Sequence, residues 1–199
     1  MKRSWQMLVG VTWVLLVTQA VADEERAREI VGSRCYSCHG KNGLSTTAQF
    51  PKLAGQNVEY LIKQMFNFQS RARRSVVMEE QIAGLTGNEI EAVARYYSRQ
   101  PMVPEKAGGG SLRAHGKRLF FEGNPRTGVS ACASCHGPQA RGALMLPRLA
   151  GQHVTYIERQ LKAFIERSRS NDRSKMHIVA RNLTSAEIKA VATFVSSLE

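Results

Sequence analysis

Apolar residues recur at spacings of three and four in several segments of this 199-residue chain, and this spacing is typical of amphipathic helices. Residues 24–34 form one such segment. Residues 58–70 present a broader apolar face, and residues 154–164 repeat its pattern. No segment alternates apolar and polar residues in the way that a half-buried strand does. The pattern therefore predicts an all-α protein.

The last predicted helix of each half carries a start signal. Thr86 is followed three residues later by Glu89, and Thr184 is followed at the same spacing by Glu187. In such a capping box the threonine hydroxyl and the glutamate carboxylate each accept a hydrogen bond from a free backbone amide of the first turn. We expect a helix to begin directly after each threonine.

Much of the chain occurs twice. The segment "FPKLAGQNVEYLIKQMFNF" (50–68) matches "LPRLAGQHVTYIERQLKAF" (146–164), and "LTGNEIEAVARYYS" (85–98) matches "LTSAEIKAVATFVS" (183–196). The offsets between the copies differ by only one or two residues, which indicates short insertions in loops. The chain is therefore predicted to be a tandem duplication of one small helical domain.

The segment between the copies has the composition of a linker. It reads "QPMVPEKAGGGS" (100–111), in which prolines end the preceding helix and three glycines add conformational freedom. We predict an N-terminal domain at residues 23–101, a linker at 102–111 and a C-terminal domain at 112–199.

Residues 1–22 have the layout of a secretory signal peptide: two cations, an apolar run and the small residues Ala20-Val21-Ala22. A retained membrane anchor is the alternative, but a spanning helix needs about 20 apolar residues. We predict cleavage before Asp23 and export to the periplasm. The mature chain is then expected to have no transmembrane span, although peripheral association with the membrane stays open.

The chain is strongly basic, with a formal net charge of +12, of which the signal peptide contributes two positive charges. A basic protein can bind nucleic acid, a membrane surface or an acidic protein. Export argues against nucleic acid. The charge therefore favours an acidic partner protein, or anionic groups held within the protein itself.

All four cysteines belong to two copies of one motif, "RCYSCHG" (34–40) and "ACASCHG" (131–137). Two disulfides or a zinc site would also use four cysteines. Neither explains why a histidine directly follows the second cysteine of each copy. C-x-x-C-H is the attachment signature of c-type haem. The sequence thus predicts two covalently bound haem c groups, attached through Cys35, Cys38, Cys132 and Cys135 and ligated by His39 and His136.

The ligand on the opposite face of each iron decides between a catalyst and an electron carrier. Met78 and Met176 occupy matching positions, 39 and 40 residues after their histidines, in polar stretches that we expect to be non-helical. This pairing predicts that both are axial ligands. His177 follows Met176, but its counterpart is Glu79, so a ligand role for it would break the symmetry.

Basic residues cluster just before both methionines, in "RARR" (71–74) and "RSRSNDRSK" (167–175). The simplest interpretation is a solvated basic loop. Alternatively, some of these arginines pair with haem propionates or form a docking surface for an acidic redox partner. His115 and His153 are expected at the surface or at helix caps rather than on iron.

With these motifs the chain resembles the di-haem cytochrome c4 family of exported bacterial electron carriers. The resemblance implies two tandem class I-like cytochrome c domains, one haem each, packed face to face. It also implies that the carbonyls of Pro51 and Pro147 accept a hydrogen bond from Nδ1–H of His39 and His136. The second half departs by inserting "NPRTGVS" (124–130), which puts the docking of its first helix in question.

The resemblance implies a periplasmic electron-transfer carrier rather than an enzyme. Its donor would be a quinol-oxidising complex or a periplasmic dehydrogenase, and its acceptor a haem-copper oxidase or another terminal reductase. One alternative is a cytochrome subunit of a larger oxidoreductase such as flavocytochrome c sulfide dehydrogenase. Another is a di-haem peroxidase or thiosulfate-oxidising enzyme, which requires a different or open distal position on one iron.

Overall fold

Helices make up the regular structure of residues 21–106 and 108–199, the part of the chain that this computed structural model describes. Within that part the only β pairing consists of two isolated bridges, Asn124 with Val129 and Ala143 with Leu146. The all-α prediction is confirmed. The predicted signal peptide falls outside the described residues except at its last two positions. No helix among the described residues is both long and apolar enough to cross a membrane.

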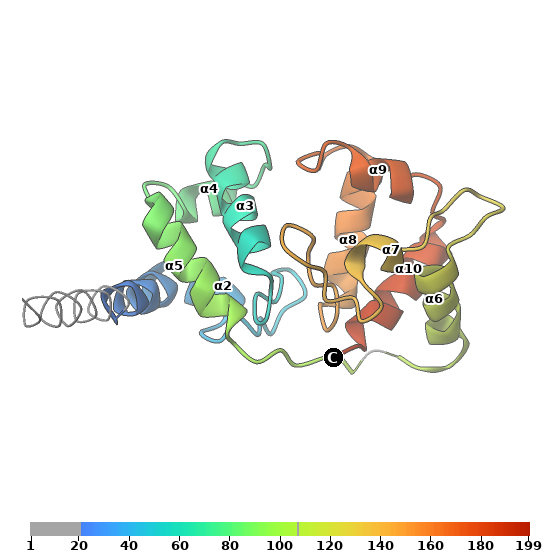
Figure 1. Cartoon of the computed structure of the whole chain (residues 1–199), viewed down its shortest axis with the longest axis horizontal. Coiled ribbons are helices and arrows are strands. Elements are labelled where there is room, and N and C mark those ends of the chain that lie inside the picture. The colour runs from blue at the N-terminus through green and yellow to red at the C-terminus, as the bar shows by residue number, and fades with distance from the viewer. Residues whose placement is uncertain (1–20, 107) are drawn as a thin grey trace, which may run out of the picture.

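The helices occur in the same order in both halves of the chain (Figure 1). After a helical stretch at 21–30, the first half contains η1 (Val31–Cys35), α2 (Tyr36–His39), α3 (Val58–Gln69), α4 (Val76–Gln81) and α5 (Gly87–Ser98). The second half contains α6 (Gly110–Glu122), α7 (Ala133–His136), α8 (Val154–Ile165), α9 (Lys175–Ala180) and α10 (Ser185–Ser196). The halves lie side by side with α3 and α8 facing each other, and the connecting segment runs along one edge.

Each half has its own hydrophobic core. In the first, the helical stretch at 21–30 packs with α3 and α5, and in the second α6 crosses α10. The α6–α10 crossing is very close: a Cβ added at Gly116 would lie 2.0 Å from the carbonyl oxygen of Ala190. The apolar faces predicted at 58–70 and 154–164 form α3 and α8, so those two helix predictions are confirmed.

The insertion at 124–130 does not displace the first helix of the second half. Asn124 pairs with Val129 in a short bridge, and its side-chain amide donates to Glu187 Oε1 over 2.8 Å. Because Glu187 belongs to the capping box of α10, this hydrogen bond ties the inserted loop to the helix against which α6 packs. The doubt about the docking of this helix is thereby removed.

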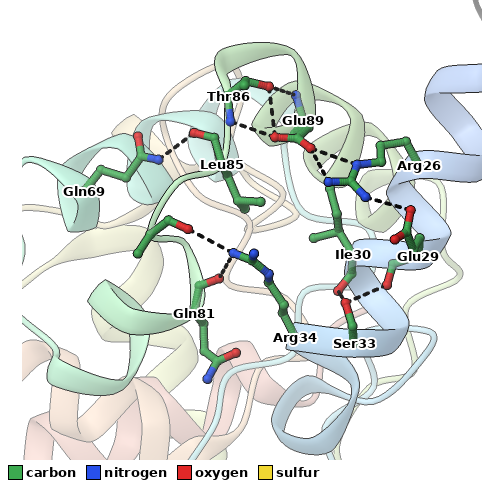
Figure 2. Close-up of polar contacts among 11 residues, drawn as sticks. Arg26, Glu29, Ile30, Ser33, Arg34, Gln69, Gln81, Leu85, Thr86 and Glu89 are labelled. Carbon is green, nitrogen blue, oxygen red and sulfur yellow. Dashed lines mark hydrogen bonds and ion pairs between the residues drawn. The ribbon is translucent and has the colours of Figure 1, made fainter.

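Both predicted capping boxes are present. In the first half the box also anchors the N-terminal helical stretch, as Figure 2 shows: Glu89 accepts from the backbone amide of Thr86 over 2.8 Å and from the Arg26 guanidinium over 2.6 and 2.8 Å. The Thr86 amide, followed by the hydrogen bond from Arg26, lowers the pKa of Glu89 to about 2.

This capping carboxylate should make the first half sensitive to acid. The ordinary pKa of a glutamate is about 4.3, so its lowered value in the folded protein means that the ionised form stabilises the fold. That stabilisation is complete above the ordinary pKa and is lost as the pH falls towards 2. We therefore expect Glu89→Gln to lower the free energy of unfolding at pH 6, and the difference from wild type to shrink steadily between pH 5 and pH 2.

Chemical denaturation of the holoprotein across this pH range measures the effect. Glu91→Gln is a matched control, because Glu91 lies on the same helix and, among the described residues, its carboxylate pairs with exposed Arg95 alone. A pH-independent loss in Glu89→Gln, or an equal pH-dependent loss in the control, would contradict the assigned role of the carboxylate.

Candidate functional site

The two cysteine–histidine motifs fold into the same local structure. Cys35 ends η1 and Cys38 lies in α2, directly before His39; in the second half Cys135 and His136 lie in α7. The four cysteines form no disulfide, and the described residues contain no cluster of three potential metal ligands among histidine, cysteine and carboxylate side chains. Burial raises the pKa of the Cys35 and Cys132 thiols to about 11. The sulfur atoms of Cys35 and Cys132 thus lie at the edge of an apolar interior.

Each motif histidine is buried, with one ring nitrogen bound to the backbone. His39 Nδ1 lies 2.9 Å from the carbonyl oxygen of Pro51, and His136 Nδ1 lies 3.1 Å from that of Pro147. Since a carbonyl oxygen only accepts hydrogen bonds, Nδ1 carries the proton and Nε2 keeps its lone pair. Burial lowers the pKa of both imidazoles, which favours this neutral form.

A single cavity of about 1500 Å³ runs through both halves. It exceeds the range of about 300–1,000 Å³ that is typical of a site for one small molecule. The predicted site residues of both halves line it: Cys35, Cys38, His39, Met78, Pro51, Cys132, Cys135, His136, Met176 and Pro147. The structure therefore brings together every residue that the sequence nominated, and apolar side chains form most of the remaining wall. The sulfur and nitrogen ligands and the apolar lining of the cavity together fit two large, flat, apolar groups with iron at their centres.

The two candidate methionines lie on short helices, not in the non-helical stretches that the sequence suggested. Met78 is the third residue of α4, and its amide donates to the hydroxyl of Ser75 over 3.4 Å. Met176 is in the first turn of α9, and its amide donates to the Asp172 carboxylate over 2.6 Å. That expectation was wrong: each methionine lies in the first turn of a six-residue helix, and a side chain before it accepts from its free amide, the N-cap Ser75 in α4 and Asp172, two residues before the N-cap, in α9.

The loop after α4 is fixed to the cysteine motif of its own half. Arg34, the first residue of that motif, donates to the carbonyls of Gln81 and Ala83 over 3.2 and 3.0 Å (Figure 2). Gln69 at the end of α3 donates to the carbonyls of Ile82 and Leu85. These bonds hold the helix that carries Met78 in a fixed position relative to His39.

His177, the neighbour of Met176, has both ring nitrogens engaged by the protein. Nδ1 lies 3.1 Å from the carbonyl oxygen of Phe164, and Nε2 accepts from the Arg167 guanidinium over 3.3 Å. Nδ1 therefore donates to the backbone, and the lone pair of Nε2 is occupied by the arginine. This arrangement leaves Met176 as the candidate donor on α9.

The solvated-loop interpretation is wrong for one arginine of each basic cluster. Arg73 donates to Gln64 over 2.7 Å and, across the boundary between the halves, to the Tyr156 hydroxyl over 3.0 Å. Its guanidinium also lies over the Phe68 ring, 4.7 Å from the centroid. The other arginines of that cluster, Arg71 and Arg74, are exposed.

Arg169 repeats these contacts in the second half. It donates to Gln160 over 2.7 Å and across the boundary to the Tyr60 hydroxyl over 3.0 Å, and its guanidinium lies 4.5 Å from the centroid of Phe164. Arg73 and Arg169 both line the cavity, and neither pairs with an acidic side chain among the described residues. Two guanidinium groups in the cavity wall fit a bound group that carries carboxylates.

His153 is the N-cap residue of α8, one of the two placements that the sequence suggested. It does not lie at the surface, however, but is buried between the two halves with 6% of its surface exposed. Its Nε2 lies 2.9 Å from the carbonyl oxygen of Ser45, and its Nδ1 lies 2.7 Å from the carboxylate of Glu105. The same carboxylate pairs with Lys52 over 2.9 Å. The predicted linker is thus bound to both halves through Glu105, and sequence reasoning missed this cluster.

Known proteins resemble this chain in both sequence and fold. The cytochrome c family model matches residues 114–199. A cytochrome c4 from Thiocapsa roseopersicina is 37% identical over 182 residues, which cover 89% of this chain and 94% of that protein. The chain belongs to the cytochrome c4 family. The crystal structure of reduced cytochrome c4 from Pseudomonas stutzeri superposes with a TM-score of 0.82 at 32% identity, covering 88% of this chain and 98% of the other.

A further relative carries a name that refers to its role. The "thiosulfate dehydrogenase electron acceptor" of Thiomonas intermedia is 36% identical, covering 93% of this chain and 85% of that protein.

Membership of the cytochrome c4 family confirms the fold class and the cofactor. The chain is a pair of tandem cytochrome c domains, and it carries two covalently bound haem c groups with iron at their centres. The cytochrome c4 family is one of electron carriers.

Proposed function

We propose that this protein is a periplasmic di-haem electron carrier, without an enzymatic activity of its own, between a respiratory donor and a terminal oxidase or reductase. The observation that supports this proposal is the symmetry of the cavity. Each half lines it with two cysteines, one buried histidine and one methionine in matching positions. An enzyme would need a displaceable distal ligand on at least one iron, whereas a carrier closes both.

The residues of each half have separate tasks. The cysteines would form the thioether bonds to haem, and Nε2 of His39 and His136 and the sulfur atoms of Met78 and Met176 would supply the ligands of its iron. The carbonyls of Pro51 and Pro147 hold the imidazoles by Nδ1 and so fix their orientation. Bound haem c supplies an iron that alternates between the ferric and ferrous states.

The basic side chains of the two arginine clusters are proposed to have two roles, one towards the bound haem groups and one towards a redox partner. Arg73 and Arg169 are proposed to pair with haem propionates, because both line the cavity without an acidic partner among the described residues. The exposed arginines Arg71, Arg74 and Arg173 are proposed to face an acidic redox partner, whose approach they would speed at low ionic strength. Candidate partners are a quinol-oxidising complex as donor and a haem-copper oxidase as acceptor.

The organisation of the chain follows from the same proposal. Residues 1–22 would be removed as a signal peptide on export to the periplasm, residues 23–101 and 112–199 would form the two haem domains, and residues 102–111 would join them. Glu105 restrains that linker by binding Lys52 and His153.

A second donor is favoured by one of the comparisons. The similarity to the Thiomonas intermedia protein supports electron acceptance from a sulfur-oxidising enzyme such as thiosulfate dehydrogenase. Rapid reduction of the purified protein by thiosulfate plus that enzyme, and slow reduction by a quinol-oxidising complex, would favour this donor over the respiratory one.

Redox titration of the purified mature protein tests the carrier proposal. We expect two electrons to be taken up per chain, and the fully reduced protein to bind no carbon monoxide at neutral pH, because a methionine closes each iron. Optical spectroscopy under carbon monoxide provides the measurement. Stoichiometric carbon monoxide binding at one haem would support a di-haem enzyme instead, and would overturn the proposal.

A further inference from the structure

The peptide group that holds His39 is itself bound by the other half of the molecule. The carbonyl oxygen of Pro51 accepts from His39 Nδ1 over 2.9 Å. The N–H of the same peptide group belongs to Lys52, and it donates over 2.9 Å to the side-chain oxygen of Gln152 in the second half. One planar peptide therefore connects a proposed iron ligand of the first half to a glutamine of the second.

The second half of the molecule contains the equivalent connection, in the opposite direction. The carbonyl oxygen of Pro147 accepts from His136 Nδ1 over 3.1 Å, and the N–H of that peptide group, on Arg148, donates to the side-chain oxygen of Gln56 over 2.7 Å. Gln56 and Gln152 are the glutamines of the repeated P-x-L-A-G-Q segments. Each glutamine thus reaches across the boundary to the histidine-binding peptide of the opposite half.

The orientation of both side-chain amides is fixed by their partners. The Gln152 oxygen also accepts from the amide of His153 over 3.0 Å, and its nitrogen donates to the carbonyl of Lys52 over 2.9 Å. Gln56 makes the equivalent bonds to Asn57 and Arg148, both over 3.0 Å. Backbone N–H groups can only donate, so the oxygen must face them.

Both glutamines are also shielded from water, with 6% of Gln56 and 5% of Gln152 exposed. In a site of low polarity hydrogen bonds are stronger, and bonds in a chain polarise one another.

The delocalised peptide bond carries this polarisation from one end of the group to the other. Donation by the N–H increases the negative charge on the carbonyl oxygen, which then accepts a stronger hydrogen bond from the histidine. A stronger bond at Nδ1 makes the imidazole a more basic ligand. A more basic ligand favours ferric over ferrous iron and so lowers the reduction potential.

We propose that Gln56 and Gln152 are positioning residues that tune the haem of the opposite domain. Gln152 lowers the potential of the first haem through the Pro51–Lys52 peptide, and Gln56 lowers that of the second through the Pro147–Arg148 peptide. The inference rests on the axial roles proposed for His39 and His136. It makes the domain boundary part of both redox centres, because any motion that separates the halves breaks both bonds and raises both potentials.

The experiment is a haem-resolved redox titration of the holoprotein, followed by NMR through the haem methyl resonances of each domain. Gln152→Leu keeps the volume of the side chain but removes its oxygen. The affected hydrogen bond loses about 10–30% of its strength, and the loss is larger for ferric than for ferrous haem, so the ratio of reduced to oxidised first haem at fixed ambient potential should rise by up to roughly 5-fold. The second haem should stay unchanged, and Gln56→Leu should give the reverse pattern.

A second measurement and a second variant keep the proposal testable if the first variant does not fold. In the ferrous protein the Nδ1–H resonance of the opposite-domain histidine should move upfield as its hydrogen bond weakens. If Gln152→Leu does not fold, Gln152→Ala replaces it, with the same direction of change. Asn57→Ala is the control: its side-chain amide donates across the boundary to the carbonyls of Arg141 and Leu146, but it touches neither histidine-binding peptide through its side chain.

A shift in the haem of the variant's own domain, equal shifts in both haems, or no shift in either would overturn the proposal, as would a shift in Asn57→Ala equal to that in Gln152→Leu. Failure of the axial assignment of His39 and His136 is seen separately, because wild-type protein would then lack the strongly shielded ring-proton resonances of a histidine bound to ferrous haem.

Discussion

Replacing Met78 with alanine should abolish the methionine–ferric charge-transfer band of the first haem and leave that of the second intact. The band arises only when a thioether sulfur binds ferric iron, so its intensity in the whole protein should fall by about half. Met176→Ala should remove the other half, and the double variant should show no band. Near-infrared and visible absorption of the oxidised protein provides the measurement.

The same variants should open the irons to external ligands. Loss of the thioether lowers the reduction potential of the affected haem, since methionine ligation raises it. The reduced Met78→Ala protein should bind one carbon monoxide per chain.

Met145→Ala is the matched control, because Met145 lines the same cavity but is 59% exposed and has no methionine counterpart in the first half. An undiminished band in Met78→Ala, or a reduced band in Met145→Ala, would refute the assignment of the distal ligands.

Local sequence signals were sufficient for the longer helices and for the set of residues that lines the cavity. The spacing of apolar residues predicted α3 and α8, and the threonine–glutamate pairs predicted the starts of α5 and α10. These features depend on neighbours within one or two turns, which a single sequence displays directly. The duplication also narrowed the choice of candidate ligands, because a residue with the same role in both halves must occur at matching positions in both.

The boundary between the halves could not be predicted in this way. Arg73, Arg169 and His153 carry charge or polarity, so their composition suggested exposure, yet all three lie where the two copies meet. The groups that they bind in the opposite copy, on Tyr156, Tyr60 and Ser45, are more than 80 residues away in the chain. Burial of these groups depends on acceptors that the other half supplies, and no local pattern records which residue will supply them.

The role of the repeated glutamines could not be predicted from the sequence either, although their repetition was visible there. The identity of Gln56 and Gln152 in the two copies was visible in the sequence, but it indicated only that both positions are constrained. The constraint became intelligible when each side chain was found on the backbone of the other copy. Repetition therefore indicated which residues are important in this chain. Their roles could be identified only from the arrangement of the two copies in space.

Replacing both cysteines of one motif with serine should reduce the covalently bound haem from two groups per chain to one. Thioether attachment needs the cysteine sulfur atoms, which both lie at the cavity beside the histidine of the same motif. We expect Cys35→Ser/Cys38→Ser to keep the second haem alone, and Cys132→Ser/Cys135→Ser to keep the first. The pyridine haemochrome spectrum and the mass of the intact mature chain give the count.

The single variants separate attachment from binding. Cys35→Ser alone should retain its haem through one thioether bond, which shifts the pyridine haemochrome band of that haem and leaves the other unchanged. Ser37→Ala is the control, because Ser37 lies between the two cysteines and supplies no thioether. Two covalent haems in the double variant, or an unshifted band in Cys35→Ser, would contradict the attachment chemistry. The mass must therefore fall by one haem for each motif removed, and a chain without all four cysteines must mature colourless.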